Sequence, residues 1–255
     1  MVRQQPTSND GFTLLQSMLY HSQQITTHYW LTPLLAYIHR NRGEKVEHYY
    51  HYLQHLDNHL LCSNDERPLI ERTWDFLGDK KGVWQHCNCD CSVLKDSLGV
   101  AFPHYWFYKL EFILWVNREE ILEEMKNKYK ELMENKDYVR LWNEFRLTAK
   151  NSVEHISPQT PQDIDTNRVS SEVLHTFGNL ALVSRSINAE FGNLPFNERR
   201  ERFLNRNRSK LDSLKMALIY QNDKWNNTRA ADHQRQMIEF IELHLKKDFQ
   251  REKKP

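Results

Sequence analysis

The sequence has little glycine or proline, with seven Gly and eight Pro in 255 residues, and almost no net charge. Hydrophobic residues make up 39% and charged residues 27%, which excludes collagen-like and low-complexity disordered chains. A formal net charge of +1 also excludes a globally basic nucleic-acid binder, so any nucleic-acid contact has to come from a local patch. The length allows one large domain or two smaller ones.

Long apolar runs are missing as well. No stretch approaches the roughly eighteen apolar residues of a membrane span, and no basic start is followed by the short apolar segment of a secretory signal. We therefore expect a cytoplasmic protein that does not enter a membrane. The cysteines fit that setting as free thiols or metal ligands, because Cys87, Cys89 and Cys91 are too close together for unstrained local disulfides.

Apolar residues recur at helical spacing through the first half of the chain. The pattern predicts four helices before the cysteine cluster, two within residues 11–40 and one each over 44–62 and 67–77. A loop-like segment over 78–99 follows. Pro103 can then begin an aromatic-rich helix that continues into a charged, solvated one. These last two helices are expected over 105–115 and 118–136.

The pattern changes at Tyr138. Large and polar side chains then alternate, which predicts strands over 140–148 and 152–156 and a third strand over 180–184. Beyond Phe196 helical spacing returns, with helices expected over 197–206, 210–220 and about 230–249. The expected fold is mostly α with a small β component. A helical domain would span 1–137, and 138–255 would hold a strand–strand–helix element with helices behind it.

One segment combines the residue types that phosphodiester hydrolysis needs. Such hydrolysis requires a base that deprotonates water and a cation that offsets charge at phosphorus and on the departing oxygen. His155 can act as a neutral base, and the adjacent Glu154 is a hard oxygen donor suited to Mg²⁺. Asn188 can supply a second, neutral oxygen. Asn179 is expected to fix its loop against the strand of His155.

The joined pattern resembles a known family. The motifs Glu-His-Ile-Ser-Pro-Gln over 154–159, Gly-Asn-Leu over 178–180 and Asn188 with Gly192-Asn193 look like an HNH (His-Me finger) nuclease domain. This domain lies at the C-terminus of GmrSD-type and SspE-like modification-dependent restriction and defence proteins. Segments 29–33, 56–62 and 105–115 resemble the helical region that precedes it. In that family a nucleotide-handling N-terminal domain comes first, and because its motif is absent we expect a truncated or naturally short relative.

The resemblance implies a role for each matching residue. His155 matches the general base, Glu154 an acidic metal ligand, Asn179 the Asn that orients the base, and Asn188 the last metal ligand, with Asn193 as a rival. It implies a ββα-metal finger that nicks or cuts double-stranded DNA in prokaryotic antiviral defence against foreign or modified DNA, including the phosphorothioate and type IV restriction systems. An Asn in the last position favours Mg²⁺ or Mn²⁺ over Zn²⁺.

Geometry raises one question about the shared metal. Adjacent residues of a regular strand face opposite sides, so Glu154 and His155 can meet one metal only if the strand ends or twists there. Pro158 lies close enough to end the strand. The alternative function is a catalytically inactive DNA-binding or partner-docking module, in which the finger has lost its activity.

Basic residues cluster directly after the proposed metal ligands. A charge run is usually a solvated helix face, but beside an active site it can hold the backbone of a duplex. Arg185 is a further candidate for a phosphate contact. The run itself consists of Arg199, Arg200, Arg202, Arg206, Arg208 and Lys210.

Two other patterns suggest metal sites. Four histidines form one helical stripe, which a metal-binding helical bundle would use, although surface or partly buried histidines beside a core are the commoner case. They are His48, His51, His55 and His59. The second pattern is His86 with Cys87, Cys89 and Cys91, which can hold a structural Zn²⁺ or be reduced thiols in a loop.

Overall fold

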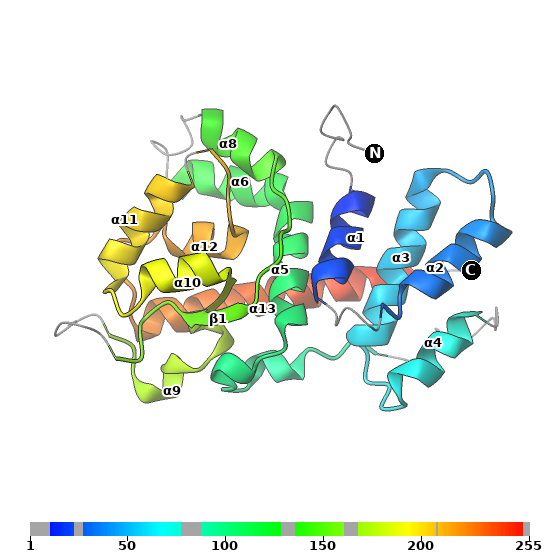
Figure 1. The fold of residues 1–255 in the computed structure, drawn as a ribbon, viewed down its shortest axis with the longest axis horizontal. Coiled ribbons are helices and arrows are strands. Elements are labelled where there is room, and N and C mark those ends of the chain that lie inside the picture. The colour runs from blue at the N-terminus through cyan, green and yellow to red at the C-terminus, as the bar shows by residue number, and fades with distance from the viewer. Residues whose placement is uncertain are drawn as a thin grey trace. The chain divides into compact units, whose positions relative to one another are not determined.

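Helices dominate the computed structural model, which contains one two-stranded sheet in its described part (Figure 1). This confirms the predicted mostly α fold with a small β component. The structure describes residues 11–22, 28–77, 88–128, 136–160, 168–207 and 209–251. The chain divides into two compact units, one formed by 1–91 with 242–255 and the other by 92–241. None of the described helices is both long and apolar enough to span a membrane.

The first unit consists of helices packed through their apolar faces. The four predicted helices are present as α1 (Gly11–Ser22), α2 (Leu31–Arg40), α3 (Val46–Leu61) and α4 (Leu69–Leu77). α3 packs against the other three. Its buried residues Leu53, Leu56 and Leu60 repeat at three- and four-residue steps, so they lie on one face of the helix.

The histidine stripe of α3 lies partly in this core. His55 and His59 are buried with their ring centroids 4.2 Å apart, and His55 Nδ1 lies 3.4 Å from Asp248 Oδ2. The other two members, His48 and His51, are exposed. Burial, and next to it His55, lower the pKa of His59 to about 3. Among the described residues no group of three or more His, Cys, Asp or Glu is placed to hold a metal ion. The stripe is therefore divided between the core, with His55 and His59, and the surface, with His48 and His51.

The second unit surrounds the small sheet. α5 (His104–Val116) is buried over nearly its whole length and packs against both the sheet and α12 (Leu214–Ile219). It is followed by α6 (Arg118–Lys128) and α8 (Lys136–Asn143), which pack together. Because α5 forms part of this core, the predicted domain boundary after residue 137 falls inside the second unit.

The predicted strand over 140–148 is wrong. α8 covers its beginning, and the chain then has no regular structure until the first strand begins at Ser152. The buried Leu141, Trp142 and Phe145 follow helical spacing, whereas the adjacent Leu141 and Trp142 break the two-residue alternation of a strand. After the helix, the backbone amide of Lys150 donates to the hydroxyl of Tyr108 at 2.7 Å instead of to a neighbouring strand.

The two other predicted strands are confirmed. β1 (Ser152–His155) pairs antiparallel with β2 (Leu180–Val183), with His155 opposite Leu180. The connection contains α9 (Ser171–Leu174) and the 3-10 turn η4 (Phe177–Asn179). The helices that follow are α10 (Arg185–Phe191), α11 (Phe196–Arg206), α12 and α13 (Asn227–Arg251). Figure 1 shows α10 and α11 beside β1. The order strand, strand, helix is thus the one expected from the sequence.

Candidate active site

β1 separates the candidate residues onto two faces. Val153 and His155 are buried, whereas Ser152 and Glu154 are partly exposed, which is the two-residue alternation of an extended strand. The strand ends at His155. Glu154 and His155 therefore leave the end of β1 in opposite directions.

Asn179 fixes the loop that follows His155. Its Oδ1 accepts from Ser157 N at 3.0 Å and from Trp225 Nε1 at 2.9 Å, and its Nδ2 donates to Leu174 O at 2.9 Å. Its backbone oxygen accepts from Ile156 N at 2.8 Å. Asn179 is fully buried and has no hydrogen bond to the imidazole of His155. It positions the loop and does not face a substrate.

Gly178, next to Asn179, is pressed against α13. A Cβ added there would lie 2.3 Å from Ala230 O and 2.7 Å from Gln234 Cβ, so only a hydrogen fits. The Gly178 amide also donates to Gln234 Oε1 at 3.2 Å. The glycine of this motif is thus required by helix packing rather than by a turn.

His155 contacts a second histidine that the sequence analysis left without a role. His155 Nε2 lies 3.1 Å from His175 Nδ1, and the two rings are at 79° to each other. Gln159 Nε2 lies 3.5 Å from His155 Nε2. Burial, then His175 and Arg199, lower the pKa of His155 to about 4, so its imidazole is neutral near pH 7. The only sequence signal for His175 was a histidine four residues before Asn179.

Arg199 holds the opposite face of the strand together. Its side chain is fully buried, with Nη1 3.1 Å from Glu154 Oε1 and also donating to the backbone oxygen of His155. Its other nitrogens donate to Gly192 O and Leu194 O. Burial raises the pKa of Glu154, and Arg199 opposes that shift. The prediction that Arg199 contacts DNA is wrong, because the guanidinium binds the protein itself.

Asn188 lies on the same side of β1 as Glu154. Its Nδ2 donates to Ser152 Oγ at 2.6 Å, and Ser152 and Glu154 share one face of the strand. Among the described residues, neither Asn188 Oδ1 nor Glu154 Oε2 has a hydrogen-bond partner. Mg²⁺ typically takes one or two protein oxygens and completes its shell with water and phosphate, and both of these atoms are oxygen donors. Asn193 is exposed beyond Gly192, whose φ is +47°.

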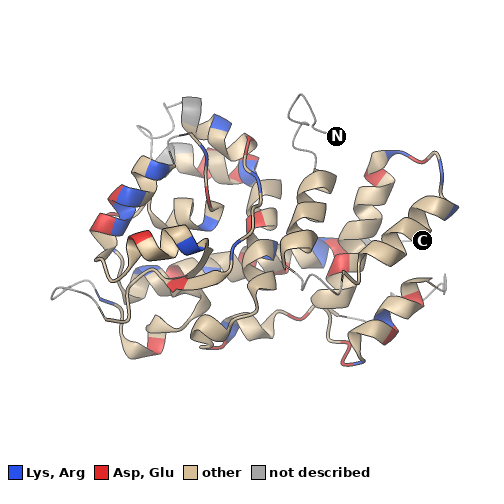
Figure 2. Cartoon of the chain, viewed as in Figure 1, with Lys and Arg blue, Asp and Glu red and all other residues tan. Residues whose placement is uncertain are grey.

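The remaining arginines of the basic run are largely engaged. Arg200 Nε donates to Tyr220 O at 2.9 Å, and Arg202 Nη1 donates to Glu190 O at 2.7 Å. Arg206 lies 3.0 Å from Glu190 Oε2 and 3.1 Å from Asp212 Oδ2. Figure 2 shows acidic residues interleaved with the basic ones along α11. Such pairing weakens the positive field that a duplex would meet.

Arg185 differs from this run. It is the first residue of α10, exposed, and has no hydrogen bond or ion pair with any residue in the described ranges. Arg208 lies outside those ranges. Among the described arginines predicted to contact DNA, Arg185 is therefore the one whose side chain is exposed without a partner in those ranges.

The cysteine cluster is only partly described, since Cys87 and His86 lie outside the described residues. Cys89 and Cys91 are not in disulfides. Cys91 is buried, with its Sγ 3.9 Å from Glu242 Oε1. The backbone of Cys89 forms an isolated antiparallel β-bridge with Ser63. The described part contains no set of three zinc ligands here.

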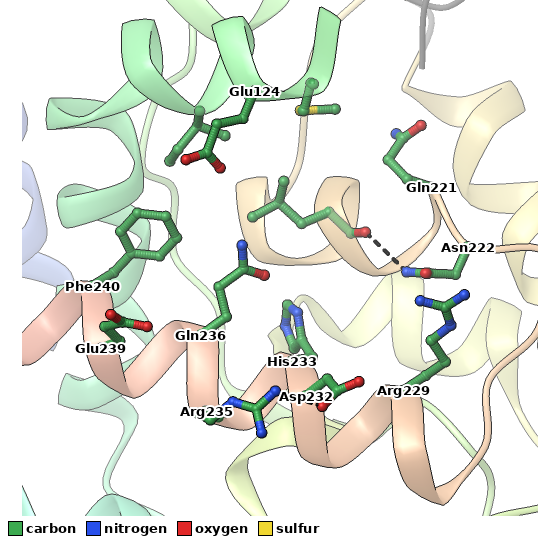
Figure 3. Close-up of a pocket in the computed structure, with 13 residues that line it drawn as sticks. Glu124, Gln221, Asn222, Arg229, Asp232, His233, Arg235, Gln236, Glu239 and Phe240 are labelled. Atoms are coloured by element: carbon green, nitrogen blue, oxygen red, sulfur yellow. Dashed lines mark hydrogen bonds and ion pairs between the residues drawn. The ribbon is translucent and has the colours of Figure 1, made fainter. Parts of the chain in front are cut away.

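A pocket of about 430 Å³ lies elsewhere in the second unit, among α6, α12 and α13. Figure 3 shows side chains of both charges and several amides around it. They include Glu124, Asn222, Arg229, His233 and Phe240. Asp232 and Arg235 at its edge pair with each other at 2.7 Å. The pocket contains none of the residues predicted for catalysis.

The fold and the site together define a helical protein built around a strand–strand–helix element, with a buried histidine at the end of the first strand. The family model of the GmrSD restriction endonucleases, C-terminal domain, matches residues 88–240. This is more than half of the chain, which therefore belongs to that family, as its motifs predicted. No curated protein and no solved structure matches the chain.

Proposed function

We propose that this chain is a metal-dependent DNA endonuclease or nickase of the HNH type, acting in prokaryotic defence against foreign or modified DNA. The main support is the β1–β2–α10 element, where neutral His155 ends the first strand and Glu154 and Asn188 lie along its other face. Membership of a restriction endonuclease family supports the nuclease class and DNA as the substrate.

His155 is the general base of this proposed reaction. It takes a proton from water as the water oxygen bonds to phosphorus, and the bond from phosphorus to the 3′ oxygen breaks. The departing oxygen is protonated from solvent. Mg²⁺ or Mn²⁺, when bound, supplies positive charge that offsets the negative charge of the transition state. Glu154 and Asn188 are the residues that would hold it.

Two buried residues keep this arrangement in place. Asn179 ties the loop after His155 to η4 and to Trp225, and Arg199 ties Glu154 and the backbone of His155 to the end of α10. Both sets of contacts exist without substrate, so the loop after His155 and the Glu154 carboxylate are held in place in advance. Arg185, with Arg200, Arg202 and Arg206 further along, would contact the DNA backbone.

An inactive DNA-binding or partner-docking module is the second candidate. The observation in its favour is the ion pair between Arg199 and Glu154, which already engages one oxygen of the proposed metal ligand. A carboxylate held this way binds a cation more weakly than a free one, because the guanidinium competes with it.

Plasmid cleavage distinguishes the two. Supercoiled plasmid is incubated with the wild type, His155→Ala and the control His39→Ala, in Mg²⁺, Mn²⁺ or EDTA. Nicked or linear product that needs metal and is lost only in His155→Ala supports the nuclease. DNA binding that is equal in all three proteins, with no cleavage by any, supports the inactive module.

A further inference from the structure

We propose that His175 is a positioning residue that fixes the tautomer of His155, with the ring proton on Nε2 and Nδ1 left as the atom that accepts a proton from water. The inference rests on the proposed nuclease function and names the reacting atom of its base. It follows from the contact between the two rings and from the glycine that holds His175 in place.

Two neutral imidazoles in contact share one hydrogen bond, and it can run in only two directions. A neutral imidazole has one N–H donor and one lone pair. If His155 Nε2–H donates to His175 Nδ1, both histidines adopt the Nε2–H form, which is the more stable form of the free side chain. The reverse bond requires both in the less stable Nδ1–H form. The 3.1 Å contact therefore favours a proton on Nε2 of His155.

The surroundings of His155 agree with this assignment. Gln159 Nε2 lies 3.5 Å from His155 Nε2, and its amide can take either orientation. His155 Nδ1 has no hydrogen-bond partner among the described residues. The contacts of the ring are thus at Nε2, and Nδ1 remains available to water.

Gly99 holds His175 against His155. The Gly99 amide donates to His175 O at 2.9 Å, and the glycine has a φ of +55° in the 3-10 turn η3 (Gly99–Ala101), which packs against β1. A Cβ at this position would lie 2.9 Å from His175 Nδ1, closer than real Cβ contacts allow. The turn therefore approaches the imidazole so closely that only glycine fits.

The test compares His175→Asn with His175→Leu. The two side chains have nearly the same size and branching, but Asn Oδ1 takes the place of Nδ1 and keeps an acceptor, whereas Leu removes it. Long-range ¹H–¹⁵N NMR near neutral pH, without metal or DNA, reports the tautomer of His155. We expect the Nε2–H form in the wild type and in His175→Asn, and loss of that single form in His175→Leu.

Plasmid nicking by the same proteins supplies the second measurement. We expect kcat to fall about ten-fold or more in His175→Leu at unchanged KM, and to recover largely in His175→Asn, a loss typical of supporting partners of active-site histidines. Circular dichroism confirms that each variant is folded. Gly99→Ala should lower kcat in the same way without removing any polar group. Gly43→Ala, at a φ of +91° with no neighbour within 4 Å, is its control.

The outcomes separate this inference from the nuclease proposal. An Nδ1–H form of His155 in the wild type, or equal kcat in His175→Leu and the wild type, overturns the role of His175. A wild type that holds the Nε2–H form but never cleaves DNA overturns the nuclease function and leaves the hydrogen-bond assignment standing.

Discussion

Arg199 Nη1 lies 3.1 Å from Glu154 Oε1, with the arginine fully buried and the glutamate side chain 16% exposed. The ion pair joins α11 to β1, although Arg199 and Glu154 are 45 residues apart in the sequence. Removing one partner of a buried pair leaves the other charge uncompensated. The pair thus stabilises the position of β1, the strand that ends at His155.

We expect Arg199→Ala to destabilise the protein by about 3 kcal/mol or more, because Glu154 and three backbone oxygens lose their donor. Arg199→Lys should recover little, since an ammonium cannot reproduce the planar fork. Urea unfolding measures both. Arg202→Ala, in which the lost arginine is exposed, is the control, and an Arg199→Ala protein as stable as this control would contradict the prediction.

Asn179→Ala is expected to cost about 1–3 kcal/mol, because it leaves the buried Trp225 Nε1 and Ser157 N without their acceptor. Activity should fall as well, since the loop after His155 loses its anchor. Asn179→Asp keeps the acceptor and should retain more stability than the alanine variant. Thermal melts of the two variants give the comparison, and equal melting temperatures would argue against the anchoring role.

Stability should decrease as the pH falls from about 6.5 towards 3. Burial lowers the pKa of His59 from 6.5 to about 3, and burial lowers that of His155 to about 4. The unfolded chain therefore takes up protons in this range before the folded chain does, which favours unfolding. Above pH 6.5 these groups add no pH dependence. Chemical unfolding across this range measures the free energy of unfolding at each pH. This free energy should change less with pH for His59→Gln than for the wild type or for the control His39→Gln, whose site is exposed.

Metal binding should depend on Glu154 and Asn188 and not on Asn193. Ligands that bind only the folded state raise its melting temperature. We expect Mn²⁺ to raise the melting temperature of the wild type and of Asn193→Ala, but not of Asn188→Leu or Glu154→Gln. A lost Mn²⁺ effect in Asn193→Ala, with the effect retained in Asn188→Leu, would exchange the roles of the two asparagines.

Arg185→Ala should weaken DNA binding and lower the salt dependence of the association constant by about one phosphate contact. The exposed side chain has no partner in the described part of the chain, so its loss should leave the fold unchanged. Fluorescence anisotropy with a labelled duplex at several salt concentrations measures both quantities. Arg235→Ala, exposed and paired with Asp232, is the matched control. Identical salt slopes for the two variants would remove Arg185 from the interface.

The elements that depend on local spacing could be predicted from the sequence. The helices of the first unit, β1, β2 and the family follow from periodicity and from motifs around His155, Asn179 and Asn188. The strand predicted at 140–148 was wrong because the adjacent Leu141 and Trp142 are both buried, which breaks a two-residue alternation and, with Phe145, fits helical spacing.

The site depends more on contacts between distant residues, which spacing does not reveal. Arg199 stands in a basic run that looks solvated, yet its position after α10 directs it inward to Glu154. His175 contacts His155 only because Gly99 packs against it. The sequence pattern identified candidate side chains, and the tertiary structure shows which of them are in contact.

Gly178 belongs to a sequence motif associated with catalysis, but the structure needs it for packing. Its hydrogen is required by the approach of Ala230 O and Gln234, so a chain that had lost its histidine base would still need this glycine in order to fold. We therefore expect pattern searches that use Gly-Asn-Leu to retrieve active and inactive domains alike. If His155 and His175 act as proposed, their joint presence would be a more selective filter for genomic surveys.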